Sequence, residues 1–307
     1  MALDDIQMHI LQEVADLHTI PEGAYNIRSN GSLAGRNTTA NIDITSKPDG
    51  TGIDIHIKPG TKNESVHIPV VISAAGYRET VYNDFHIGEN CDVVIIAGCG
   101  IHNKGACEAR HDGVHTFYVG RNSKVVYVEK HYGEGDGTGT NIMNPKTVLH
   151  LEEGAYVEMN TTQIKGVDST LRETVADLKD RASLVISEKI MTHGNQFAKT
   201  VFSVDLNGEG SSTHVVSRSV ARDDSYQEYN SLVNGNTKCS GHTECDAIIM
   251  DNGRVSAIPR INANNVDAAL VHEAVIGKIA GEQLVKFMTL GLTEKEAEEE
   301  IIAGFLK

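Results

Sequence analysis

Tryptophan is absent from this chain of 307 residues, and Phe, Tyr and Trp together make up only 5% of it. The chain also lacks any run near the roughly 18 apolar residues that a membrane-spanning helix needs. It has no basic excess, because 27 Lys and Arg stand against 42 Asp and Glu, which gives a net charge of −15. Nucleic-acid backbones and anionic membranes bind surfaces rich in Lys and Arg. We therefore expect neither as a partner.

Two further signals are missing. The chain contains no G-x-x-x-x-G-K-[ST] motif, so we expect it to hydrolyse no ATP and to work without being an enzyme itself. Its first residues, Met1 to Asp5, are acidic where a secretion signal would be basic. The five cysteines are an odd number, which is typical of a reducing compartment with free thiols. These features together predict a cytoplasmic protein.

A short turn pattern recurs along the middle of the chain. The segment Ile87-Gly88-Glu89-Asn90 returns as Val119-Gly120-Arg121-Asn122, and related segments start at 151, 178 and 206. Each is followed by an alternating strand rich in β-branched residues. A period near 30 residues favours the stacked coils of a β-solenoid, because each coil buries its apolar face only against its neighbours. The alternative is a β-sandwich, whose turns usually recur every 8 to 12 residues or so.

The two ends of the chain have a helical pattern. Residues 3–17 predict a short amphipathic helix, and residues 280–290 predict another that Gly291 closes. Thr293 and Glu296 form the pattern of a capping box at the start of a third helix. We therefore divide the chain into an N-terminal helical segment (1–27), a β-helix core (28–265) and a C-terminal helical segment (266–307), which could cap the solenoid or bind a partner.

Two groups of thiols and imidazoles are candidates for chemistry. The first contains Cys99, His102, Cys107, His111 and His115, with spacings that match no closed zinc motif. Cys99 stands between two glycines, so we expect an open bend that leaves its sulfur accessible to persulfide or nucleophile chemistry.

The second group joins Cys239 and Cys245-Asp246 to the pair His272-Glu273. Thiolate, imidazole and carboxylate ligands together would hold iron less tightly than four thiolates. A site of this kind could therefore bind iron and release it.

Several segments resemble the SufB/SufD family of iron–sulfur cluster assembly scaffolds. The resemblance is carried by Cys245-Asp246-Ala247-Ile248-Ile249-Met250, by Val271-His272-Glu273-Ala274-Val275-Ile276 and by Gly291-Leu292-Thr293-Glu294-Lys295-Glu296-Ala297. Upstream, Gly98-Cys99 ahead of His111-Asp112-Gly113-Val114 resembles the sulfur-entry segment of that family. The similarity covers most of residues 66–307.

The resemblance implies a right-handed parallel β-helix that serves as an assembly scaffold. It implies that Cys99 accepts persulfide sulfur from a cysteine desulfurase and that Cys245 receives it. Together with His272 and Glu273, Cys245 would then hold iron or a transient iron–sulfur cluster. It also implies a SufC-type ABC ATPase bound to the C-terminal helices, and a short single scaffold of this kind is most simply a homodimer. Relatives can carry a flavin, but no residues here identify a flavin site.

Two other functions fit part of the sequence. Parallel β-helices also occur as polysaccharide lyases or hydrolases, in which paired carboxylates do the chemistry. The absence of Trp and the free thiols argue against that reading. The third possibility is a non-catalytic interaction module whose thiols have no role. The roles of Cys91, Cys107 and Cys239 and the type of cluster stay open.

Overall fold

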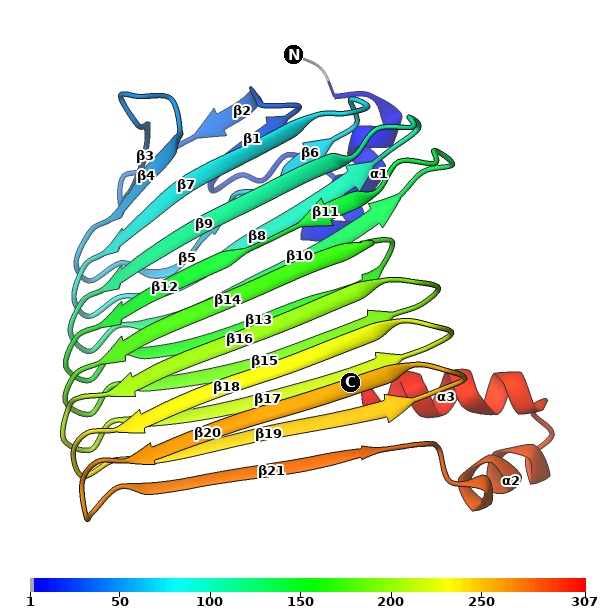
Figure 1. Cartoon of the computed structure of the whole chain (residues 1–307). Helices are drawn as coiled ribbons and strands as arrows, with labels where there is room; N and C mark the ends of the chain where they lie inside the picture. Colours follow the sequence, from blue (N-terminus) through cyan, green and yellow to red (C-terminus); the bar gives the residue numbers. More distant parts are fainter. Residues whose placement is uncertain (1–2) are drawn as a thin grey trace.

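The computed structural model describes residues 3–307 and has the predicted β-solenoid fold, with two long sheets of mostly parallel strands wound around a common interior (Figure 1). Met1 and Ala2, which belong to the predicted N-terminal segment, lie outside the described residues. Each coil contributes one strand to each sheet, so neighbouring strands in a sheet come from successive coils. Within residues 3–307, no helix is long and apolar enough to cross a membrane.

The first sheet has the strand order β2-β1-β5-β8-β10-β13-β15-β17-β19-β21, with β6 beside β1 and β8. Its strands are β1 (Ala24–Ser29), β2 (Ser32–Asn37), β5 (Lys62–His67), β6 (Val70–Ile72), β8 (Asp92–His102), β10 (Lys124–Glu134), β13 (Tyr156–Lys165), β15 (Ser183–Thr192), β17 (Ser212–Ala221), β19 (Ser240–Ile249) and β21 (Ala269–Gly277).

The second sheet runs β20-β18-β16-β14-β11-β9-β7-β4-β3, with β12 beside β14 and β9. Its strands are β3 (Ile42–Ser46), β4 (Gly52–Ile57), β7 (Arg78–Ile87), β9 (Ala109–Val119), β11 (Asn141–Met143), β12 (Lys146–Leu151), β14 (Ser169–Leu178), β16 (Phe197–Leu206), β18 (Tyr226–Gly235) and β20 (Arg254–Ala263).

The recurring turn of the sequence forms one edge of the solenoid. Its fourth position has a positive φ at Asn90, Asn122, Gly154 and Arg181, and in the segment that starts at 206 the positive φ falls one residue later, at Gly210. Glycine and asparagine tolerate this left-handed conformation better than most residues. The N–H of each such residue donates to a carbonyl of the next coil, as from Asn90 to Arg121 at 2.9 Å. The turn repeat therefore stacks in register and sets the spacing of the coils.

Helix α1 (Asp5–Ala15) packs on the outer side of the first sheet, against β8 and β10. Asp4 caps it. The two glycines around Cys99 make room for this helix, because a Cβ at Gly100 would lie 2.0 Å from Ile10. The expected open bend at Cys99 is therefore wrong. The segment lies inside strand β8, and its glycines serve close helix packing.

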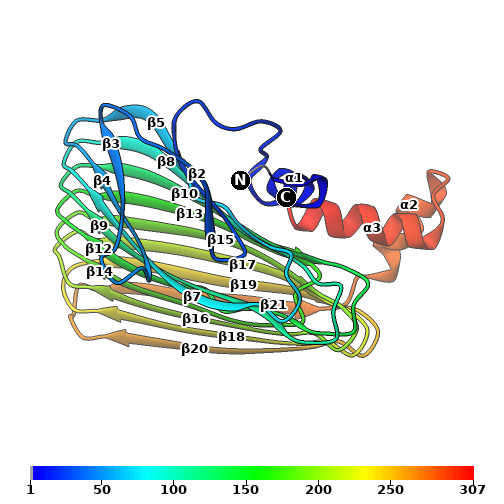
Figure 2. The same cartoon turned by 90° about the horizontal axis from the view of Figure 1, so that it is seen from above.

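The C-terminal end contains more strand than expected. Strand β21 occupies 269–277 within the segment assigned to helices, and helix starts only with α2 (Gly281–Thr289). Helix α3 (Glu294–Phe305) begins with the predicted Thr293 capping box and packs on the same sheet as α1 (Figure 2). Helix α2 has no buried residue and projects from the solenoid.

Candidate functional site

Cys99 faces the interior of the solenoid and is only 6% exposed. His111 faces the interior from the opposite sheet, where its Nδ1 lies 3.0 Å from Glu79. Arg28 donates to the same carboxylate at 2.8 Å. Burial disfavours a charged imidazole, but Cys99 and Glu79 outweigh it and raise the pKa of His111 to about 10. A cationic imidazole therefore lies beside the Cys99 sulfur.

Interior-facing polar residues line up between Cys99 and Cys245. The parallel pairing of the first sheet aligns one inward position of successive strands, namely Ala97, Glu129, Thr161, Glu188, Ser217 and Cys245. The neighbouring inward column starts at Cys99 and continues through His131 and Gln163. Five strand spacings of about 4.8 Å separate the strands of the two thiols by about 24 Å. We refer to these two adjacent columns together as the polar column.

Arg172 holds the polar column together from strand β14 of the opposite sheet. Its guanidinium donates to Glu129 at 3.0 Å and to Glu188 at 3.2 Å, and it lies 2.8 Å from Nδ1 of His131. Ser217, which is paired in register with Cys245, donates to Glu188 at 2.9 Å. A continuous hydrogen-bonded path therefore joins a strand neighbour of Cys99 to a strand neighbour of Cys245.

The charges of this path are set by burial and by Arg172. Burial raises the pKa of both glutamates, but His131 and Arg172 lower that of Glu129 to about 2. At Glu188 burial outweighs Arg172 and the pKa stays raised. Two interior cavities of about 10 Å³ each border Glu188, which is close to the space one water molecule needs.

Cys245 lies at the far end of the polar column and is 1% exposed. Burial first, and then Glu188, raises the pKa of its thiol to about 12, so the isolated chain carries it protonated. An incoming metal cation would have to displace that proton.

His272 is the other interior-facing member of the predicted iron site. Its Nδ1 lies 2.6 Å from the Thr243 hydroxyl, and its ring stacks with Tyr229. Thr243 is its partner in register, so Cys245 is its diagonal neighbour, with Cα atoms about 8 Å apart from strand geometry. The structure therefore brings Cys245 and His272 to the same side of one sheet.

Glu273 does not join them within one chain. Successive residues of a strand point to opposite faces, so Glu273 points outward when His272 points inward. Its carboxylate lies 3.5 Å from Nε2 of His242, another outward residue. The three residues predicted to bind iron are thus divided between the two faces of the first sheet.

Of the larger Cys/His group considered from the sequence, the structure brings together Cys99 and His111 but not the other members. His102 is 2.8 Å from Glu134, and Cys107 is exposed in a loop. Cys91 and Cys239 are buried free thiols. Neither group of possible metal ligands found among the described residues contains a cysteine.

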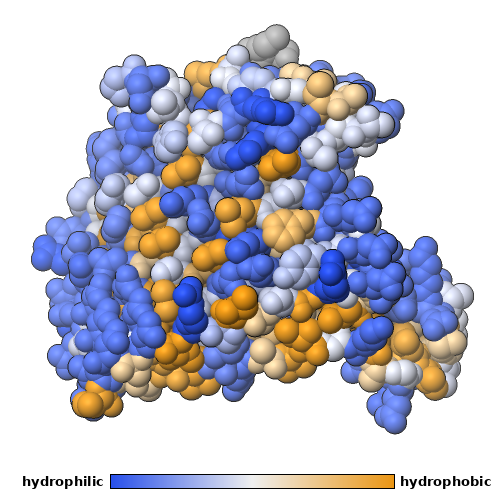
Figure 3. All heavy atoms as spheres, viewed as in Figure 1, coloured by the Kyte–Doolittle hydropathy of each residue, from blue (hydrophilic) through white to orange (hydrophobic). Residues whose placement is uncertain are grey.

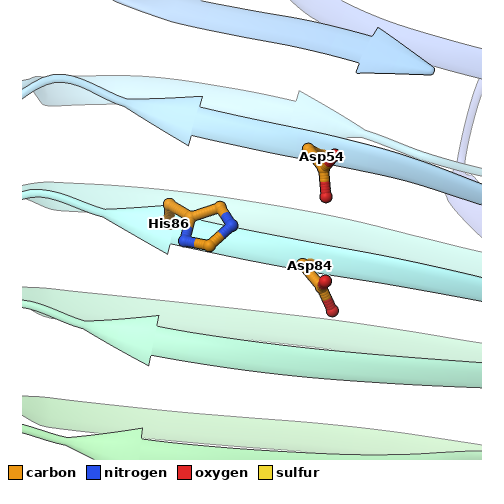
Figure 4. A group of neighbouring side chains, drawn as sticks. All are labelled: Asp54, Asp84 and His86. Carbon is orange, nitrogen blue, oxygen red and sulfur yellow. The ribbon is translucent and has the colours of Figure 1, made fainter. Parts of the chain in front are cut away.

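One of these two groups joins Asp54, Asp84 and His86 on the outer face (Figure 4). The ammonium group of Lys47 already sits between its two carboxylates, 2.5 Å from Asp54 and 2.6 Å from Asp84. The position that a metal ion would take between the two carboxylates is therefore occupied by Lys47.

The interior residues Glu79, Glu129, Arg172 and Glu188 were not identified from the sequence. The signal for them was present, because each stands at a position that strand alternation turns inward, among neighbours such as Val125 and Tyr127. A charged residue at an inward position is rarely left unpaired. Which charges pair across two sheets depends on the coil register, and the sequence alone does not fix that register.

The buried histidines make folding stability depend on pH. Burial lowers the pKa of His115 to about 4 and that of His131 to about 3, so both gain a proton on unfolding below about pH 6.5. As the pH falls from 6.5 towards 4, each of these two histidines is expected to lower the free energy of unfolding by about 1.4 kcal/mol per pH unit. His111, with its raised pKa, contributes stability that is complete below pH 6.5 and is lost as the pH rises towards 10. Urea unfolding across this range should give maximal stability near pH 6.5, and a flat profile would contradict the assignment.

The solenoid is open at its last coil. Strands β20 and β21 end the two sheets, and apolar residues gather along the lower edge of the molecule in Figure 3. The exposed apolar side chains of these two strands include Ile258, Val271, Val275 and Ile276. Val275 is 69% exposed. Free strand edges and exposed apolar residues together are typical of a surface that another chain covers. Cys245 and His272 lie directly behind this edge.

Comparisons with known proteins agree with these features. The profile of the SufBD core domain of the SUF system for FeS cluster assembly matches residues 75–305. An iron–sulfur cluster assembly SufBD family protein of Archaeoglobus fulgidus is 27% identical over 265 residues, which are 84% of this chain and 69% of the relative. One from Pyrococcus horikoshii is 28% identical over 287 residues, 91% of this chain and 86% of the relative. Iron–sulfur cluster assembly protein SufB of Bacillus subtilis is 31% identical over 173 residues, 54% of this chain and 36% of that protein.

Proposed function

We propose a scaffold function for this chain, which belongs to the SufBD family of iron–sulfur cluster assembly proteins. In this proposal the chain accepts sulfur and iron and holds the cluster while the cluster forms. The names of its relatives describe assembly proteins, in keeping with the expectation that the chain is not itself an enzyme. A cytoplasmic location remains part of the proposal.

The polar column between Cys99 and Cys245 carries this proposal. A solenoid interior is normally filled with aliphatic side chains, and burying Glu129, Arg172 and Glu188 costs desolvation free energy that apolar residues would avoid. The column runs from one interior thiol to the other, with a histidine near each. A transfer route for sulfur explains why polar groups occupy this space.

The first chemical step is an exchange at Cys99. Its sulfur, which lies beside the imidazole of His111, attacks the outer sulfur of a persulfide on a donor such as a cysteine desulfurase. The sulfur–sulfur bond of the donor breaks, the donor leaves as a thiolate, and Cys99 carries the new persulfide. The step needs no external oxidant or reductant. Two small-molecule thiols then reduce this persulfide: they become a disulfide, the bond to the outer sulfur breaks, and that sulfur leaves as hydrosulfide while Cys99 is restored. The hydrosulfide passes along the polar column to Cys245, where thiolate and imidazole would hold iron.

We propose that the open coil is the homodimer interface. Pairing of the exposed edges at β20 and β21 would bury their apolar side chains and bring two copies of Cys245 and His272 towards each other. Each chain alone supplies two interior ligands, so a second copy completes a four-ligand set. Anaerobic reconstitution of the purified chain with iron, sulfide and thiol should give a charge-transfer absorbance, and a colourless protein would contradict the function.

The C-terminal helices are proposed to bind a SufC-type ATPase. Helix α2 exposes Val285 and Met288, and its C-cap Leu290 is 80% exposed. Deleting residues 281–307 should abolish co-purification of the co-expressed ATPase. Because α3 also covers Val220 and Met250, the variant Val285→Asp serves as the control that leaves this packing intact. Retention of the ATPase by both variants would refute docking at these helices.

A further inference from the structure

Three metal-binding side chains meet on the outer face of the last two strands of the first sheet. His242 and Glu244 come from β19 and Glu273 from β21, and one ligand atom of each lies within 4.8 Å of the others. Glu244 and Glu273 are partners in register, and His242 stands one outward position away. We call these three residues the outer cluster.

The imidazole of His242 is placed to bind rather than to stabilise the fold. Its Nε2 is enclosed and has no hydrogen-bond partner among the described residues, and the Glu273 carboxylate is 3.5 Å away. A surface cavity of about 510 Å³ borders His242, Val271 and Glu273, which leaves room for a hydrated ion. A nitrogen donor, an acidic partner and open space are therefore present together.

The ligand chemistry selects a class of ion. One imidazole and two carboxylates suit divalent ions such as Fe²⁺ and Mn²⁺, whereas Zn²⁺ structural sites and Cu⁺ favour thiolates. The outer cluster differs from the group at Asp54 and Asp84, whose carboxylates already hold the Lys47 ammonium. Asp246, the next outward residue of β19, adds further negative charge beside the cluster.

We propose that His242, Glu244 and Glu273 form a loading site for ferrous iron on the outer face of the solenoid, separate from the thiol site in the interior. The identification of the physiological ion as iron rests on the proposed scaffold function. The existence of the binding site does not depend on that function. Glu244 immediately precedes Cys245 and points to the opposite face. Iron held there is separated from the receiving thiol by one sheet, next to the open coil.

The test uses Mn²⁺ as a paramagnetic probe with the metal-free chain of 307 residues. Free Mn²⁺ gives an EPR signal that is lost on binding, so titration yields an affinity. His242→Ala and Glu244→Gln should each weaken Mn²⁺ binding about tenfold or more, since each removes one of three ligands. Both side chains are partly exposed at an outer face, and circular dichroism should confirm an unchanged fold.

The matched controls are His150→Ala and Glu228→Gln, which remove one imidazole and one carboxylate from the outer face of the second sheet, away from the outer cluster. Both should leave the Mn²⁺ affinity unchanged. If His242→Ala and Glu244→Gln also leave it unchanged, or if the two controls weaken it as much as they do, the outer site does not exist. A chain that binds Mn²⁺ as expected but forms no cluster on reconstitution would refute the scaffold function and leave the metal site standing.

Discussion

Replacing Arg172 with methionine is expected to lower the free energy of unfolding by about 3–5 kcal/mol. Methionine is close to arginine in size, so the variant removes the charge and leaves little empty space. Glu129 and Glu188, which are 3% and 2% exposed, would lose the guanidinium that hydrogen-bonds both. A buried carboxylate without its partner is costly, and one of the two should take up a proton instead. Urea unfolding at neutral pH measures the loss.

The matched control is Lys199→Met, which removes an ion pair to Glu228 on the solvated face of the solenoid. Pairs of this kind contribute about 1 kcal/mol or less. Adding Glu188→Gln to the Arg172→Met variant should recover part of the lost free energy of unfolding, because the second substitution removes one buried carboxylate that has lost its partner. If Arg172→Met lowers the free energy of unfolding by no more than Lys199→Met does, the polar column is not a tightly coupled network.

Replacing Cys99 with serine is expected to abolish cluster formation when sulfur comes from a cysteine desulfurase and cysteine. Serine cannot form a persulfide, so sulfur would have no entry point to the polar column. The same variant should form the cluster normally when free sulfide is supplied, because sulfide can reach Cys245 from the open coil. Charge-transfer absorbance and acid-labile sulfide measure both reactions.

Cys91→Ser is the control for this experiment. Cys91 is a buried thiol in the turn before β8, and its sulfur contacts the carbonyl of Lys58 outside the polar column. It should form clusters with either sulfur source. If Cys99→Ser forms clusters with the desulfurase as well as the wild type does, sulfur does not enter at Cys99. His111→Gln should slow the desulfurase-dependent reaction, because the attacking sulfur loses its cationic neighbour.

The solenoid could be predicted because its signal is local and repeated. The residues of the turn that take a positive φ, such as Asn90, Asn122 and Gly154, recur at nearly constant spacing, and the caps Asp4 and Thr293 mark two helix starts. Strand β21 was missed because its residues 269–277 have few turn signals and precede a helical pattern. The bend expected at Cys99 failed for a related reason, since flanking glycines also permit close packing of a helix.

The site was predicted only in part. The resemblance pointed to Cys99, Cys245, His272 and Glu273, and it gave no information on which side of the sheet each lies. The division between inner and outer faces follows from strand alternation once β21 is recognised as a strand. Arg172 and its two glutamates are 16 or more residues apart in the chain and meet only through the stacking of coils. Predicting that these three residues pair would therefore have required the register between the coils.

Anaerobic reconstitution of the Cys245→Ser and Cys239→Ser variants beside the wild-type chain tests the scaffold function most directly. Both cysteines are buried free thiols close to the last coil, and only Cys245 lies on the polar column. With iron and free sulfide supplied, the charge-transfer absorbance should fall to background in Cys245→Ser and stay at the wild-type level in Cys239→Ser. Full absorbance in Cys245→Ser would contradict the proposal that the cluster forms at this thiol.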